Sequence, residues 1–110
     1  MSLIRTGAGT TITITSGTAT SAAIASDRTA MYGLIFPSAL TSTTMTFTVC
    51  GTLAGTYVAL YDETNTQVSV TVAASRAYSL PDSLSSWPFF KIVLGSNEGA
   101  DRTLTLCVKG

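Results

Sequence analysis

The sequence predicts an all-β protein: a two-sheet antiparallel sandwich, jelly-roll-like, with a flexible N-terminal arm. Apolar residues recur at every second position in many segments, while no window of eleven or more residues keeps an apolar stripe at helical spacing. Seven or eight such segments are separated by turn residues at roughly ten-residue intervals, which is typical of a sandwich. With 110 residues the chain fits one domain. We expect an arm over residues 1–10, too polar and too glycine-rich to order itself, and a sandwich domain over residues 11–110.

The first half of the chain contains three clear strand patterns. In "TTITITS", Ile12 and Ile14 share one phase and threonines occupy the other, as in a half-buried strand. "SAAIAS" predicts a weaker second strand. Ala30 to Phe36 is nearly continuous in apolar residues, which indicates a central strand covered on both sides, ending before Pro37. In "TSTTMTFTVCG" the predicted inward residues are Met45, Phe47 and Val49, and the outward ones are Thr44, Thr46, Thr48 and Cys50.

The second half continues the alternation. "GTYVALYD" and "QVSVTV", joined by the turn "ETNT", predict a hairpin. "LPDSLSSWP" predicts a loop or a single helical turn, and "FFKIVLG" a second nearly continuous apolar strand whose polar phase is marked by Lys91. After the loop "SNEGAD", "RTLTLCV" closes the domain. The residues predicted to point inward in these segments are Val58, Leu60, Val68, Val70, Val72, Leu104, Leu106 and Val108.

The composition predicts a surface that is neutral and rich in hydroxyl groups. Charged residues make up 11% of the chain, against about 25% in a typical soluble domain. The 20 threonines and 13 serines take the place of charged surface residues. Threonine fits a pleated strand well, but it lacks the charge that keeps sheet surfaces and edges from sticking to neighbours. We therefore infer that part of the surface is covered by other copies or by a partner; the alternative is that hydroxyl groups alone keep the protein soluble.

Charge and cysteine content argue against several classes of function. Six basic and six acidic residues give a net charge of zero, so no long-range field attracts nucleic acid or an anionic membrane. The start "MSLIRTGAGT" has no apolar run of signal-peptide length, and no later run could span a bilayer, so we expect a cytoplasmic protein. Cys50 and Cys107 are too few for a zinc site or a disulfide framework. No cofactor or metal is expected.

Catalysis also has little support. The chain has no histidine, the commonest general base and metal ligand. Asp62 and Glu63 are adjacent in a predicted turn, where solvated turn formers are more common than a glycosidase pair. With Asn65 they offer too few oxygen ligands for calcium. The two cysteines fall in the outward phase and could face each other on neighbouring strands, but no predicted base or cation lowers the pKa of either thiol, so small residues at a subunit contact or under a loop are the favoured interpretation.

Aromatic and basic residues are the remaining candidates for binding. Trp87, with Tyr61, Phe89 and Tyr78, could form a platform for sugar, although a tryptophan beside a proline more often plugs the end of a sandwich. Three arginines stand where predicted strands begin. Exposed ion pairs at such positions contribute little to stability. At a contact between subunits, the bidentate hydrogen bonding of the guanidinium would contribute more. The candidate partner-binding residues are Ile4, Arg5, Arg28, Arg76, Trp87 and Arg102.

Four segments carry a resemblance to a known group of proteins. "GLIFPSALTSTTMTFTV", "YVALYDETNTQVSVTVAASRAYSL", "WPFFKIVLGS" and "ADRTLTLCVK", within Gly33 to Lys109, resemble small virion proteins of tailed bacteriophages. The resemblance implies a capsid decoration or cement protein: a β-sandwich, often trimeric, bound outside a shell of major capsid protein, with no catalytic residues. One departure is "CGTLAGT", which stands where relatives usually have an Asp-Gly turn after the "TF" strand.

The expected function is therefore structural and not enzymatic. We expect a decoration protein that binds the outside of the major capsid protein shell and stabilises it. We expect it to be located on the virion exterior, after assembly in the host cytoplasm. Its expected partners are the major capsid protein and itself, as a homotrimer, with neither nucleic acid nor membrane. The alternative is a carbohydrate-binding or receptor-binding module of a phage tail or head fibre.

Overall fold

The computed structural model describes residues 7–25, 31–81, 84 and 87–109, and it confirms the predicted all-β fold. These residues include no helix of the length and apolarity that a membrane span requires. The strands are β1 Gly7–Ile14, β2 Ile24–Ala25, β3 Met31–Ile35, β4 Thr44–Cys50, β5 Val58–Ala59, β6 Ser69–Thr71, β7 Ala77–Ser79, β8 Phe89–Leu94 and β9 Arg102–Lys109.

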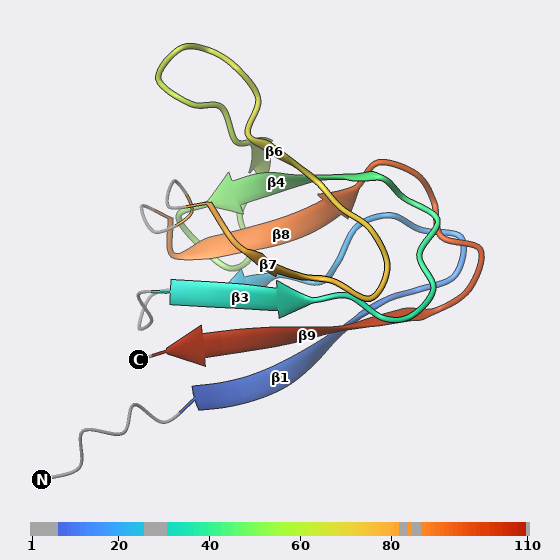
Figure 1. Cartoon of the computed structure of the whole chain (residues 1–110). Helices are drawn as coiled ribbons and strands as arrows, with labels where there is room; N and C mark the ends of the chain where they lie inside the picture. The colour runs from blue at the N-terminus through green and yellow to red at the C-terminus, as the bar shows by residue number, and fades with distance from the viewer. Residues whose placement is uncertain (1–6, 26–30, 82–83, 85–86, 110) are drawn as a thin grey trace, which may run out of the picture.

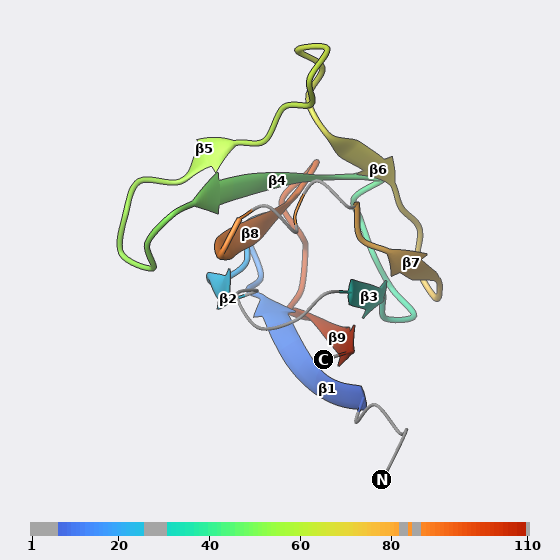
Figure 2. The ribbon, with the colours of Figure 1, turned by 90° about the vertical axis from the view of Figure 1, so that its left-hand side faces the viewer.

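The strands form two antiparallel sheets whose pairing is nested along the chain (Figures 1 and 2). The four-stranded sheet has the order β1-β9-β3-β7, and the five-stranded sheet has the order β2-β8-β4-β5 with β6 also paired to β4. The first strand therefore pairs with the last, β2 with β8, β3 with β7, and β4 with β5 and β6. A chain doubled back on itself and rolled into two sheets in this way has the topology of a jelly roll, as predicted.

The core lies between the two sheets and follows the alternation of β4 and β8. Met45, Phe47 and Val49 of β4 are buried, as predicted, and Phe90 of β8 packs edge-to-face on Phe47 with 6.3 Å between ring centroids. Such a pair adds about 1 kcal/mol beyond area burial. The four-stranded sheet contributes the facing layer, which consists of Ile12, Ile14, Leu34, Leu104 and Leu106.

The boundary of the N-terminal arm differs from the prediction. β1 begins at Gly7, and eight consecutive register pairs join it to β9, from Gly7 opposite Lys109 to Ile14 opposite Arg102. Gly7–Thr10 therefore belong to a strand and not to an arm, because pairing with β9 satisfies a backbone that has little strand propensity of its own. Residues 1–6 lie outside the described part of the chain.

The predicted hairpin between "GTYVALYD" and "QVSVTV" forms only around its turn, where Val68 N–H donates to Leu60 O at 3.0 Å and Asp62 N–H to Thr66 O at 2.9 Å. Tyr61 and Gln67 form an antiparallel bridge in the same part of the projecting loop. Away from the turn, β5 and β6 instead pair with the same edge of β4, one after the other, and the loop projects between them (Figure 1). Val58 stands opposite Val49 in the register, yet it is 63% exposed because β5 lies at the edge of the sheet. Leu60 and Val72 are buried as predicted, and Val68 and Val70 pack partly against the core; the predicted inward side chain of Val108 is outside the description.

β3 is central within its sheet but is not covered on both sides by the described residues. It pairs with β9 on one edge and with β7 on the other. Leu34 is fully buried on the inner side, whereas Ile35 points outward and is 44% exposed. The apolar run that predicted a doubly covered strand thus leaves one face open in the isolated chain.

The connection after β1 depends on a glycine. Gly17 has φ of +82°, in the left-handed region, and its N–H donates to the Glu98 carbonyl at 2.8 Å. No heavy atom lies within 4 Å of the position a Cβ would take there, so backbone conformation alone favours glycine.

Gly17→Ala is expected to lower the free energy of unfolding by about 1–2 kcal/mol, because an L-residue is strained at this φ. Urea unfolding followed by circular dichroism measures it. Gly99→Ala is the matched control, since Gly99 also faces open space but has no left-handed φ. Equal urea midpoints for Gly17→Ala and Gly99→Ala would contradict the requirement for glycine at position 17.

Candidate interaction surface

Where its side chains are described, the outer face of the four-stranded sheet presents mostly short and uncharged residues. One row across its strands is Thr11, Thr105, Ile35 and Ala77, and the next is Gly9, Cys107, Gly33 and Ser79. Thr103 stands opposite Thr13 at one end, so cross-strand threonine pairs recur on this face. Among the outward residues whose side chains are described none is charged; the first charged residue in the same alternating set is Lys109, at the end of β9.

The outer face of the five-stranded sheet is partly covered by the loop between β4 and β5. The loop contains the "CGTLAGT" departure noted above, and it brings the Tyr57 ring over Lys91, with Nζ 4.4 Å from the ring centroid. The Tyr57 hydroxyl donates to the Leu53 carbonyl at 2.9 Å. Burial raises the pKa of this hydroxyl, with a further contribution from nearby Cys50. The cation predicted to mark the polar phase is therefore held under a loop.

The two cysteines do not face each other. Cys50 is on β4 of one sheet, Cys107 is on β9 of the other, and both thiols are free and half-buried. A Cβ at Gly55 would lie 2.5 Å from Cys50 Sγ, so glycine allows the loop to lie directly against the thiol. Cys50 thus occupies a place under a loop, and Cys107 occupies the small-residue row of the open face.

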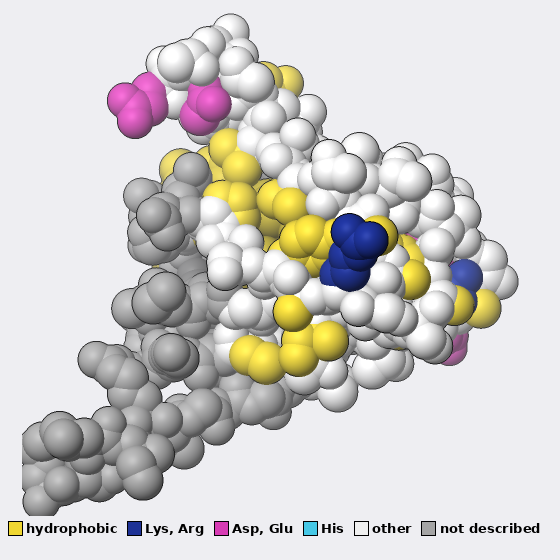
Figure 3. All heavy atoms as spheres, viewed as in Figure 1, with side chains coloured by type: hydrophobic (Ala, Val, Ile, Leu, Met, Phe, Trp, Pro, Cys, Tyr) yellow, Lys and Arg dark blue, Asp and Glu magenta, His cyan; other side chains and the backbone are white. Residues whose placement is uncertain are grey.

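An open apolar pocket of about 340 Å³ lies where β4 ends. Val49, Val58 and Leu60 form its apolar lining, and Trp87 and Tyr61 line it as well. Figure 3 shows hydrophobic side chains in the surface below the projecting loop, which carries acidic side chains. Val58, Tyr61 and Trp87 have exposed fractions of 63%, 51% and 38%, so the pocket gathers several exposed large hydrophobic side chains of the described chain.

The structure separates the predicted aromatic platform into two parts. Trp87 and Tyr61 line the same pocket, as a platform requires. Tyr78 instead packs edge-to-face on Phe36, with 5.6 Å between ring centroids, and Phe89 is a half-buried residue of β8 that does not line the pocket. Leu84 N–H donates to Pro81 O and Trp87 N–H to Leu84 O, so tight turns present the tryptophan.

The described candidate partner-binding arginines, Arg76 and Arg102, have different surroundings. Arg76 is exposed between β6 and β7, and its carbonyl accepts from Phe36 N–H at 2.9 Å. Arg102 lies at the start of β9 in the inward phase and binds Glu98, not the preceding Asp101. Ile4, Arg5 and Arg28 lie outside the described residues.

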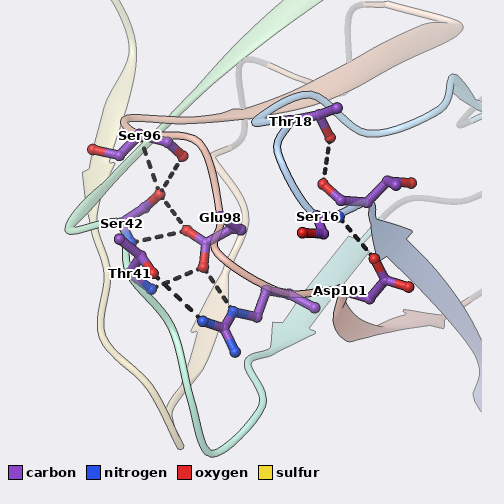
Figure 4. Close-up of polar contacts among 9 residues, drawn as sticks. Ser16, Thr18, Thr41, Ser42, Ser96, Glu98 and Asp101 are labelled. Atoms are coloured by element: carbon purple, nitrogen blue, oxygen red, sulfur yellow. Dashed lines mark hydrogen bonds and ion pairs between the residues drawn. The ribbon is translucent and has the colours of Figure 1, made fainter.

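Glu98 is a buried carboxylate that the sequence analysis did not single out (Figure 4). Its Oε1 accepts from Thr41 N–H and Arg102 Nε, both at 2.8 Å, and its Oε2 accepts from Ser42 N–H at 2.9 Å and Ser42 Oγ at 2.6 Å. Its own N–H donates to Thr18 O. The side chain thereby ties the β8–β9 loop to the segment before β4, at one end of the sandwich.

These bonds make Glu98 a structural group and not a proton acceptor. Burial, the largest single influence, raises its pKa, but the hydrogen bonds from Ser42, Thr41 and Arg102 together lower the pKa from 4.5 to about 2. A carboxylate with four donors and such a low pKa has little capacity to take a proton at neutral pH. The only sequence signal for it was a glutamate four residues before an arginine.

The acidic turn at the tip of the projecting loop is also structural. Asp62 Oδ1 accepts from Thr64 N–H, Thr64 Oγ1 and Thr66 N–H, and Asn65 takes the left-handed φ of 63° that the turn requires. The bond from the Thr64 hydroxyl, with that from Thr66 N–H, lowers the pKa of Asp62. Among the described residues, no group of three or more histidine, cysteine, aspartate or glutamate side chains is placed to hold a metal ion.

The pKa of Glu98 predicts how stability depends on pH. Because the pKa is lower in the folded state, the stabilisation is complete above pH 4.5 and is lost as the pH falls from 4.5 to about 2. Since each tenfold change in proton affinity is worth about 1.4 kcal/mol, the loss is about 3 kcal/mol. Glu98→Gln is expected to lower the free energy of unfolding at pH 7 by a similar amount. The amide nitrogen of Gln would stand against groups that donate to Glu98, and Arg102 would lose the carboxylate of its ion pair.

Urea unfolding of both proteins between pH 2 and 7 checks this expectation. The difference in free energy of unfolding between wild type and Glu98→Gln should shrink as the pH falls through the acidic range. The contribution of Asp62 cancels in this difference, because both proteins contain it. Asp101→Asn is the control, since Asp101 is exposed and accepts a single bond, from Ser16 N–H at 2.7 Å. A pH-independent difference between wild type and Glu98→Gln would exclude the ionised pair as the cause.

Comparison with known proteins gives a fold likeness. No protein-family model and no curated protein matches the chain. Among solved structures, the SPBc2 prophage-derived protein YomS is similar, with a TM-score of 0.61, 14% sequence identity and coverage of 100% of both chains. At this identity the likeness establishes a shared fold over the whole length, and it comes from a phage-encoded protein.

Proposed function

We propose that this protein is a structural virion protein of a tailed bacteriophage, a decoration protein that binds the outside of the major capsid protein shell as a homotrimer. Two independent lines support the class. The segments between Gly33 and Lys109 resemble phage virion proteins, and the structurally similar YomS is prophage-derived. Neither line depends on the surface chemistry that supports the binding role.

The observation that carries the proposal is the open outer face of the four-stranded sheet. It places Ile35, 44% exposed, among threonines, serine, alanine and glycine, and the described side chains on it carry no charge. A sheet surface of this kind lacks the features that prevent association with other proteins. A shell of major capsid protein, or a second copy, provides the cover that this face lacks in the isolated chain.

The mechanism would be stabilisation by mass action. A protein that binds only the assembled, expanded shell favours that state by its own binding free energy. Three identical faces in a trimer would bind together, so contacts that are weak singly would hold firmly in combination. No side chain has to react, in agreement with a Glu98 carboxylate fully occupied by donors. The protein would thus act on the virion exterior without a cofactor, a nucleic acid or a membrane.

A second candidate is a carbohydrate-binding or receptor-binding module. It is favoured by one observation, the lining of a single pocket by Trp87 and Tyr61. Aromatic faces of this kind stack on sugars, but Phe89 and Tyr78 do not extend the platform. Glycan binding that is lost in Trp87→Ala, with an unchanged circular dichroism spectrum, would favour this candidate over the first.

Purified protein is expected to co-sediment with expanded capsid shells and to raise their resistance to heating. Ile35→Lys places a charge in the open face and is expected to weaken shell binding roughly tenfold or more, because a buried lysine without a partner is costly. Thr71→Lys, an exposed position on the other sheet, is the matched control.

Co-sedimentation titrations and light scattering measure binding and oligomeric state. A strict monomer that fails to bind shells would exclude the proposed function. Equal binding by Ile35→Lys and Thr71→Lys would exclude the proposed face.

A further inference from the structure

The pocket at the end of β4 combines an apolar lining with an acidic margin. Val58, Trp87 and Tyr61 line it, and all three are exposed. Asp62 and Glu63 follow Tyr61 directly on the exposed projecting loop, and no lysine or arginine lines the pocket among the described residues (Figure 3). Such a surface suits an aliphatic side chain with a cationic residue next to it.

The chain itself contains such a pair of residues. In "MSLIRT", residues 1–6, Leu3 and Ile4 are aliphatic and Arg5 follows them. This segment lies outside the described residues and precedes Gly7, where β1 begins. Its apolar side chains match the pocket lining, and its single charge is opposite to those of Asp62 and Glu63.

The segment cannot reach the Val58 side of the pocket of its own chain. β1 and β5 lie at diagonally opposite edges of the sandwich, because each ends its sheet and the nested pairing aligns β1 with β2 (Figure 2). Three strand spacings of about 4.8 Å and one inter-sheet spacing of about 10 Å separate them by about 17 Å. Ile4 is three residues from Gly7 and reaches at most about 11 Å. The segment therefore falls short of Val58 in its own chain, whereas the pocket of another copy is under no such limit.

We propose that Leu3–Arg5 of one copy dock into the Val58–Trp87 pocket of a neighbouring copy, with Arg5 beside the acidic loop. The contact is heterologous, since arm and pocket are different surfaces, and such contacts close into rings when the rotation between copies allows. A three-membered ring would be the proposed trimer. The inference rests on the self-association within the proposed function but not on binding to a shell.

The chain contains one tryptophan, Trp87, so the pocket carries its own fluorescent reporter. In the full-length wild-type protein, dilution should shift Trp87 emission to the red at the same concentrations at which light scattering shows the oligomer dissociating. Ile4→Asp is expected to weaken self-association by roughly tenfold or more, since it puts a charge in an apolar pocket, and to give the red-shifted emission at all concentrations. Ser2→Asp adds the same charge to the same segment outside the docking residues and should behave like wild type.

A charge exchange tests the position of Arg5. Arg5→Glu and Glu63→Arg should each weaken self-association, and the double variant should recover it to within a few fold of wild type. Glu63 is suited to this exchange because Asp62, and not Glu63, accepts the hydrogen bonds that hold the turn. Circular dichroism of every variant verifies that the sandwich is intact.

The outcomes separate this inference from the proposed function. Emission that does not depend on concentration, equal behaviour of Ile4→Asp and Ser2→Asp, or a double variant weaker than both single variants would overturn the docking. A stable oligomer that shows the arm effects but does not bind shells would retain the docking and reject the decoration function. An oligomer that binds shells but shows no arm effects would reject the docking and retain the decoration function.

Discussion

The register between β4 and β8 is the constraint on which the rest of the structure depends. It places Phe47 opposite Ile92 and Val49 opposite Phe90, so that all four side chains enter the same layer. A slip of one residue would turn Thr46 and Thr48 into the core and expose the aromatic rings, because side chains alternate between faces. With this pair fixed, β2 and the β5–β6 edge have defined places on either side, and the nested pairing aligns the second sheet above them.

The two ends of the sandwich have contrasting chemistry. At one end the Glu98 carboxylate joins Thr41, Ser42 and Arg102 in a network with every acceptor oxygen used, which closes the sandwich with polar bonds. At the end of β4, Val58, Tyr61 and Trp87 remain exposed around an apolar pocket. Burying a carboxylate requires full hydrogen bonding, whereas exposing apolar side chains leaves free energy available for association. The closed end therefore stabilises the chain by itself, and the open end is suited to contact with another molecule.

Alternation along single segments was enough to predict the sandwich and most of its core. Met45, Phe47, Val49 and Leu60 are buried as the period of two required. Val58 follows the same period but lies on an edge strand, and position within a sheet is not encoded in one segment's pattern. Gly7–Thr10 form a strand only because β9 pairs with them. The Glu98 network and the separation of the cysteines depend on which loops and strands the topology brings together, so local sequence could not supply them.

The excursion between β5 and β6 has a consequence for how such chains diversify. Both of its stems are anchored along one edge of β4, and its apex is held by the Asp62 turn, so the segment between Leu60 and Val68 is insulated from the core. Lengthening a loop costs little, about 0.6 kcal/mol for each doubling. Insertions at this apex could therefore change what the protein displays outward while the sandwich beneath stays the same, which makes the apex a natural position for carrying foreign epitopes.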